Sequence, residues 1–180
     1  MKLYVVRHGE TMMNVLKLVN GHNEIGLNIK GKMQAAKAAQ AMENEHVDMV
    51  FCSPLKRTKQ TCNIINSKNM DVIYEPRLKE RNAKSKQFTS ENNIKFEEWY
   101  DITKDVLYKD TEGFKSVCER ISEFLNELET KYSDKSILLV THGDVCKAIY
   151  THYFKLKDAI EISEFNQKNC EIKKYTLSKE

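Results

Sequence analysis

Two histidines in this chain of 180 residues follow short apolar runs, and each is followed by glycine. The run at residues 3–6 leads into Arg7 and His8, and the run at residues 137–141 leads into His142. Apolar runs of this kind favour β-strands, and open α/β sheets bind ligands at the carboxyl ends of their strands. A neutral imidazole is a nucleophile, and a guanidinium pairs with anionic oxygens. The repeated arrangement therefore predicts two imidazoles beside one bound anion.

Two further apolar runs are followed by charged residues that fit the same chemistry. Arg57 comes after the run at residues 48–52, and Glu80 comes after the run at residues 71–75. Guanidinium groups and a protonated second histidine can hold a phosphoryl group while a first histidine attacks it. A glutamate with a raised pKa can protonate the leaving oxygen and then activate water. If the strand ends share one edge, this set of residue types predicts phosphoryl transfer.

The elements that must position these residues alternate between strand and helix patterns. Strands are predicted at residues 2–6, 48–52, 71–75 and 137–141, with an alternating edge strand at residues 170–177. Helices are predicted at residues 30–44, 54–66, 113–131 and 143–154. Strands that alternate with helices favour a parallel sheet covered by helices. We therefore expect an α/β fold, a three-layer α/β/α sandwich whose central sheet is mostly parallel with an antiparallel edge strand.

Two of the predicted helices carry specific signals. Ser53 is placed to cap the helix at residues 54–66, and Pro54 suits its first position. The helix at residues 113–131 has apolar side chains at three- and four-residue steps, which predicts one buried face. The side chains in that stripe are Phe114, Val117, Ile121, Phe124, Leu125 and Leu128.

The length of the chain fits one domain that spans residues 1–180. Residues 81–112 are polar, follow a strand end and carry few regular patterns. Loops in that position often cover a binding site, so we interpret the segment as a lid or insertion, with one helix around residues 91–107.

The composition of the chain argues against several functional classes of protein. The net charge of +3 comes from scattered lysines, which does not favour a nucleic-acid partner. No apolar run is long enough to cross a membrane, and the first residues enter a strand, which leaves no room for a signal peptide. Five cysteines without a C-x-x-C pair favour reduced thiols in a cytoplasmic protein. The histidines and cysteines lack the spacing of a metal site, so no metal and no cofactor is expected.

The ordered motifs resemble those of the histidine phosphatase superfamily, to which the phosphoglycerate mutases belong. The resemblance covers nearly the whole chain. It rests on Leu3 to Thr11 with Asn14, on Asn20-Gly21, on Gly26-Leu27-Asn28 with Gly31 and Gln34-Ala35, on Ser53-Pro54-Leu55 with Arg57 and Gln60-Thr61, and on Val140-Thr141-His142-Gly143.

The resemblance implies a catalytic role for five residues. His8 would be the nucleophile that becomes phosphorylated, and Glu80 would be the proton donor. Arg7, Arg57 and His142 would hold the phosphoryl group during its transfer. Members of this family of the same type need no metal ion for the chemistry.

The resemblance also implies further contacts with the substrate. Asn14 would touch the phosphate, and the loop at Asn20 and Gly21 would line the mouth of the pocket. The helix that starts at Gly143 would add backbone N–H donors, which suit an anion. The remaining histidines, His22, His46 and His152, are interpreted as structural or surface residues.

One segment departs from the family pattern. After Glu80, the chain has Ala83 where related phosphatases have glycine, and Lys86 where a glutamate is usual. We expect a phosphatase that hydrolyses a small phosphorylated metabolite through a phosphohistidine at His8. A phosphoglycerate mutase with the same intermediate is the first alternative, and a non-catalytic module that binds phosphoesters is the second. The sequence leaves the substrate and the oligomeric state open.

Overall fold

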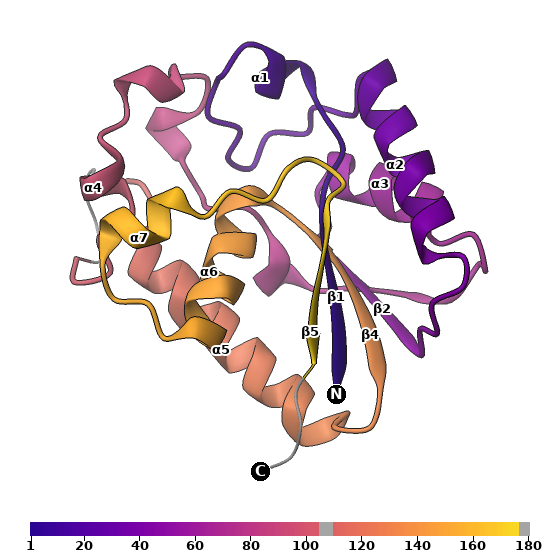
Figure 1. The fold of residues 1–180 in the computed structure, drawn as a ribbon. Helices are drawn as coiled ribbons and strands as arrows, with labels where there is room; N and C mark the ends of the chain where they lie inside the picture. The colour runs from indigo at the N-terminus through magenta and orange to yellow at the C-terminus, as the bar shows by residue number, and fades with distance from the viewer. Residues whose placement is uncertain (105–109, 177–180) are drawn as a thin grey trace.

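The computed structural model describes residues 1–104 and 110–176, and a sheet of five strands lies at its centre (Figure 1). The strands are β1 (Lys2–Arg7), β2 (Met49–Cys52), β3 (Val72–Tyr74), β4 (Ser136–Thr141) and β5 (Ile172–Thr176). Their order across the sheet is β3-β2-β4-β1-β5. The first four strands pair in parallel, and β5 runs antiparallel to β1 at one edge. The predicted sheet, including its antiparallel edge strand, is confirmed.

Helices cover both faces of this sheet. The long helices are α2 (Ile29–Met42), α3 (Lys56–Ile65), α5 (Phe114–Lys131) and α6 (Gly143–Phe154). Leu3 and Val5 of β1 pack into the apolar cluster that α5 and α6 share, whereas Tyr4 and Val6 pack into the cluster under α2 and α3. This alternation is the period of two that a strand with two covered faces requires. The predicted three-layer sandwich is therefore confirmed, and Figure 1 shows α2 and α3 on one side of the sheet and α5 on the other.

The helix signals are confirmed in one case and wrong in another. All six apolar side chains of the predicted stripe on α5 are buried. The helix predicted at residues 54–66 begins instead at Lys56, and Leu55 occupies the N-cap position without a side-chain cap. Ser53 does not cap the helix because its hydroxyl is bonded to the ring of His142, at 2.7 Å from Nε2.

Residues 81–112 contain only short elements in the described part of the segment. They are the 3-10 turns η2 (Lys84–Lys86) and η3 (Glu91–Asn93) and the single-turn helix α4 (Phe96–Trp99), and η1 (Pro76–Leu78) precedes them. The helix predicted around residues 91–107 is wrong over its described part, and residues 105–109 lie outside the described residues. Arg81 takes the carbonyl of Trp99, and the side chain of Asp101 takes the N–H of Thr103, so the helical ladder cannot continue.

Two short helices near the carboxyl edge of the sheet were not predicted. They are α1 (Met12–Val15) and α7 (Ala159–Glu164). Figure 1 shows α7 beside α4, and the chain then returns past the end of β1 to form β5. None of the helices in the described ranges is long and apolar enough to cross a membrane. The interpretation of residues 81–112 as a lid stays a prediction.

Candidate active site

A cavity of about 350 Å³ opens at the carboxyl ends of the parallel strands. Its walls include most of the residues that the sequence singled out, namely Arg7, His8, Asn14, Asn20, Gly21, Glu80 and Gly143. The two remaining candidates, Arg57 and His142, lie behind this wall. The rings of His8 and His142 are 5.3 Å apart between centroids, and Arg57 donates to the carbonyl of Gly21 at 2.8 Å. The structure therefore brings the predicted residues together.

The ring of His8 is buried and fixed in one tautomer. Its Nδ1 lies 2.8 Å from the carbonyl oxygen of Gly9, so Nδ1 carries the proton and the lone pair is on Nε2. Burial, followed by the charges of Arg57 and Arg7, holds the pKa of His8 well below its usual value. The ring is therefore neutral at pH 7, with one nitrogen free to act as a nucleophile.

Hydrogen bonds from the backbone of His8 and Gly9 to β4 and α3 hold the chain at the end of β1. Its N–H donates to the carbonyl of Thr141 at 2.9 Å, and the N–H of Gly9 donates to Thr61 Oγ1 at 3.0 Å. A side chain at position 9 is excluded, because its Cβ would lie 2.5 Å from the carbonyl oxygen of Gly31. The glycine after the histidine is thus required by the close approach of α2.

Three buried nitrogens of the predicted phosphate-binding residues have no hydrogen-bond partner among the described residues. They are Nε of Arg7, Nε of Arg57 and Nδ1 of His142. Three other guanidinium nitrogens are engaged, since Arg7 Nη1 donates to the carbonyl of Gln167 at 2.8 Å and both Nη atoms of Arg57 donate to carbonyls. Unpaired buried donors are costly, and an anionic oxygen between them would remove that cost.

The prediction that the second histidine, His142, is protonated is wrong. Burial, and then the charge of Arg57, hold the pKa of His142 well below its usual value. The ring is neutral at pH 7 in the absence of an anion, because a second buried cation beside Arg57 is unfavourable. Ser53 fixes its orientation through Nε2, so His142 offers a neutral imidazole at the site rather than a full charge.

The carboxylate of Glu80 lies against the first turn of α6. Oε2 accepts from the N–H of Gly143 at 3.1 Å, and Oε1 accepts from the N–H of Asp144 at 3.2 Å and of Arg81 at 3.0 Å. Burial and the nearby charge of Asp144 raise the pKa of Glu80 to about 7, against the opposing charges of Arg57 and Arg7. A carboxyl group with this pKa can give and take a proton near neutral pH.

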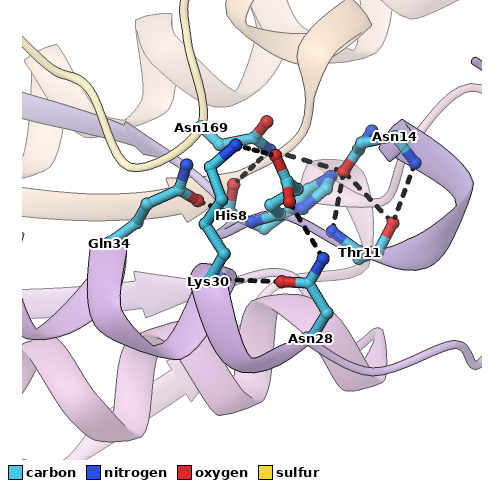
Figure 2. A network of polar contacts seen from close by, with 9 residues as sticks. His8, Thr11, Asn14, Asn28, Lys30, Gln34 and Asn169 are labelled. Carbon is cyan, nitrogen blue, oxygen red and sulfur yellow. Dashed lines mark hydrogen bonds and ion pairs between the residues drawn. The ribbon is translucent and has the colours of Figure 1, made fainter.

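Asn14 belongs to both a helix cap and the cavity wall. Its Oδ1 accepts from the N–H and the hydroxyl of Thr11, at 3.0 and 3.1 Å, in the capping box that starts α1. Nδ2 of Asn169 donates to the carbonyl oxygen of His8 at 2.8 Å and to Oδ1 of Asn14 at 3.5 Å, and the three residues belong to the polar network in Figure 2. Since Oδ1 is occupied, the Nδ2 donor of Asn14 is the group left for an anion.

The loop at Asn20 and Gly21 lines the cavity, and its backbone conformation requires glycine at position 21. Gly21 has a φ of +57°, a conformation that favours glycine, and a Cβ there would lie 2.7 Å from the side chain of Gln87. Ala83, which departs from the family pattern, is buried with an ordinary negative φ of −85°. The backbone at position 83 therefore does not require glycine, and the methyl group fits the wall.

The described part of residues 81–112 supplies a second set of cavity residues, which we call the insertion group. It consists of Arg81, Ala83, Glu91, Ile94, Phe96, Trp99 and Tyr100. Arg81 is 1% exposed, donates to the carbonyls of Glu112 and Trp99 at 2.6 Å each, and stacks on the Trp99 ring at 3.9 Å. Its Nη2 has no partner among the described residues. We call Arg7, His8, Arg57, Glu80 and His142 the strand-end group.

Sequence reasoning missed several residues that support the site. Ser53 orients His142, Thr61 holds Gly9, and Asn169 and Gln167 tie the segment before β5 to His8 and Arg7. Thr61 belongs to the quoted motif, which was the only signal available. Asn169 and Gln167 lie in an irregular stretch without a motif. Within the described ranges, no group of three His, Cys, Asp or Glu side chains is arranged to hold a metal ion.

Comparisons with known proteins point to one family. A family model described as the histidine phosphatase superfamily (branch 1) matches residues 3–180. Phosphoserine phosphatase 1 of Hydrogenobacter thermophilus is 30% identical over 183 residues, which cover 98% of this chain and 85% of that protein. The metal-independent phosphoserine phosphatase of Arabidopsis thaliana is 30% identical over 159 residues, which cover 83% of this chain and 67% of that protein.

A solved structure shares the fold. It is a phosphoserine phosphatase from Entamoeba histolytica in complex with 3-phosphoglyceric acid, with a TM-score of 0.85 and 23% identity. The superposition covers 97% of this chain and 90% of that chain. The arrangement of strands and helices that positions the cavity is thus one that known proteins use.

Proposed function

The chain belongs to the histidine phosphatase superfamily, and we propose that it hydrolyses small phosphomonoesters through a phosphohistidine at His8. The observation that carries the proposal is the fixed, neutral ring of His8, whose free Nε2 lies among unpaired buried donors. A lone pair beside an anion-binding set is the arrangement that nucleophilic attack on a phosphoryl group needs.

The first step forms a bond between Nε2 of His8 and phosphorus and breaks the bond from phosphorus to the ester oxygen. Arg7, Arg57 and the imidazole of His142 hold the phosphoryl oxygens as the charge on them changes. Glu80 gives its proton to the leaving oxygen, so the product leaves as an alcohol. The pKa of Glu80, raised to about 7, means that a large fraction is protonated at neutral pH.

The second step returns the enzyme to its starting state. The ionised Glu80 takes a proton from water, and the water oxygen attacks phosphorus. The bond to His8 breaks, inorganic phosphate leaves, and Glu80 is protonated again. One group with a pKa near the working pH can serve as acid and then as base.

The identity of the substrate is a finer question, and the insertion group bears on it. Arg81 offers an Nη2 that has no partner among the described residues, and Glu91 places a carboxyl group in the same cavity wall. A substrate that carries both a carboxylate and an ammonium group would find an opposite charge for each. Two relatives are named phosphoserine phosphatases, so O-phosphoserine is the first substrate to test.

The test is a screen of phosphorylated metabolites with inorganic phosphate as the readout, in the presence of EDTA. The panel contains 4-nitrophenyl phosphate, O-phosphoserine, 3-phosphoglycerate, sugar phosphates, α-ribazole phosphate and a phosphopeptide. We expect release of phosphate that EDTA does not abolish, and an acid-labile phosphoenzyme after an alkaline quench. Loss of all turnover with EDTA would overturn the metal-free mechanism.

The same screen separates the alternatives. A phosphoglycerate mutase would convert 3-phosphoglycerate to an isomer without releasing phosphate, which ³¹P NMR detects. A non-catalytic binding module would bind phosphate tightly and form no phosphoenzyme with any member of the panel. Either result would replace the phosphatase assignment.

A further inference from the structure

A second carboxylate, that of Asp144, lies beside the acid Glu80. Asp144 is the second residue of α6, and its backbone N–H donates to Oε1 of Glu80 at 3.2 Å. Its side chain reaches the same cavity, which both carboxylates line. Asp144 therefore touches the acid through its backbone while its own charge lies close by.

A residue of the insertion group fixes the side chain of Asp144. The hydroxyl of Tyr100 donates to Oδ1 of Asp144 at 3.0 Å, across 44 positions of sequence. The ring of Tyr100 is buried, meets the edge of Phe114 at 5.1 Å and lies under the ammonium of Lys147 at 4.9 Å. Because packing fixes the ring of Tyr100, its hydroxyl has a fixed position and holds the carboxylate of Asp144 in place.

The charges that face Glu80 differ in sign. Arg57 comes from α3, Arg7 from β1, and Arg81 is the next residue along the chain. The ring of His22 lies against the carbonyl of Glu80, with Nε2 at 2.6 Å, and Tyr100 approaches through Asp144. The arginines and the three backbone N–H donors favour an ionised Glu80, whereas Asp144 supplies the neighbouring negative charge that opposes ionisation.

We propose that Asp144, anchored by the hydroxyl of Tyr100, is a positioning residue that keeps Glu80 in its proton-donating form. The proposal rests on the proposed function, because Glu80 needs its proton only if it protonates a leaving group. The proposal also explains the contact between Tyr100 and α6, because Tyr100 holds the carboxylate that keeps Glu80 protonated.

The experiment compares the parent chain with Asp144→Asn, which keeps the shape of the side chain and removes its charge. The pKa of Glu80 should fall, so the alkaline limb of the kcat/KM profile should move to lower pH by about one unit. With an alkyl phosphate such as glycerol phosphate, kcat/KM at pH 8 should fall about ten-fold. With 4-nitrophenyl phosphate, whose leaving group needs little protonation, the fall should stay within about two-fold.

Tyr100→Phe is the second variant, because it removes one oxygen and leaves the packed ring. It should shift the same limb in the same direction by a smaller amount, since Asp144 keeps its charge and loses its anchor. Asp101→Asn is the matched control. Asp101 is the next residue along the chain, does not line the cavity and bonds to Thr103, so its profile should overlay that of the parent.

The carboxyl resonance of Glu80, followed by ¹³C NMR against pH, measures the coupling without turnover. A lower midpoint in Asp144→Asn supports the proposal even if activity is lost. An unmoved midpoint, or an equal fall in kcat/KM for both substrates, overturns it. Failure of the parent chain to hydrolyse any phosphomonoester would instead overturn the proposed function, while the NMR titration would still decide the coupling.

Discussion

The two groups of cavity residues are held in place by different parts of the fold. Most of the strand-end group is positioned by the sheet and by the helix after β2. Arg7 ends β1, His142 follows β4, and Arg57 lies in the first turn of α3. The insertion group depends on contacts between distant segments, such as Arg81 to Glu112 and Tyr100 to Asp144. Under the proposed function, the strand-end group would hold the phosphoryl group of any substrate, whereas the insertion group would contact the part that differs between substrates. Substitutions in the two groups should therefore have effects of different kinds.

The largest effect is expected for His8→Ala. Without the nucleophile no phosphoenzyme can form, so kcat should fall by at least about 10⁴-fold with every substrate. Alkaline quench followed by ³¹P NMR would show no phosphohistidine. His46→Ala is a suitable control because His46 is exposed, lies outside the cavity wall and pairs with Asp48. Substantial turnover in His8→Ala would show that His8 is not the nucleophile.

Removal of the acid should come next. Glu80→Gln should lower kcat/KM for alkyl phosphates by about 10²–10⁴-fold, and for 4-nitrophenyl phosphate by much less. In the parent, kcat/KM for an alkyl phosphate should fall as the pH rises above about 7, because Glu80 then loses the proton that it must donate. The variant should lack this limb. A variant profile that keeps the limb would show that another group titrates there.

The sequence predicted that His8 and Glu80 belong to one site, and the reason is their position in the fold. His8 and Glu80 follow strand patterns, and the carboxyl ends of parallel strands meet at one edge, so the pattern was enough to bring them together. The contacts of Ser53 show the limit of this reasoning. A serine before a helix looks like a cap, but Ser53 bonds instead to His142, which lies 89 positions away at the end of the neighbouring strand β4. Arg81 and Tyr100 had no local signal, because only tertiary contacts aim them at the cavity.

A smaller effect is expected for Arg57→Ala. The loss of a guanidinium that bonds to the Gly21 and Asn23 carbonyls and faces the anion site should lower kcat/KM by about 10²–10³-fold. Arg57→Lys should recover part of this loss, because it keeps the charge without the planar fork. Inhibition by inorganic phosphate should weaken in both variants.

The control for this substitution is Lys56→Ala, one residue earlier in the same turn of α3. Lys56 is exposed and does not line the cavity, so activity and inhibition by phosphate should match the parent. If Arg57→Ala changed only the KM of one substrate, Arg57 would behave like a member of the insertion group, and the division between the two groups would fail.

The smallest effect, and the one that separates the two groups most sharply, is expected for Glu91→Gln. O-phosphoserine and 3-phosphoglycerate share a skeleton but carry an ammonium and a hydroxyl at the same carbon, so a carboxylate in the cavity should favour the first. Removal of its charge should shift the ratio of their kcat/KM values about three- to five-fold toward 3-phosphoglycerate, and should leave 4-nitrophenyl phosphate unchanged. Glu97→Gln, an exposed position on α4, should leave the ratio unchanged. An equal loss with all three substrates would mean that Glu91 acts on the reaction itself, and the insertion group could no longer be treated as the part that selects the substrate.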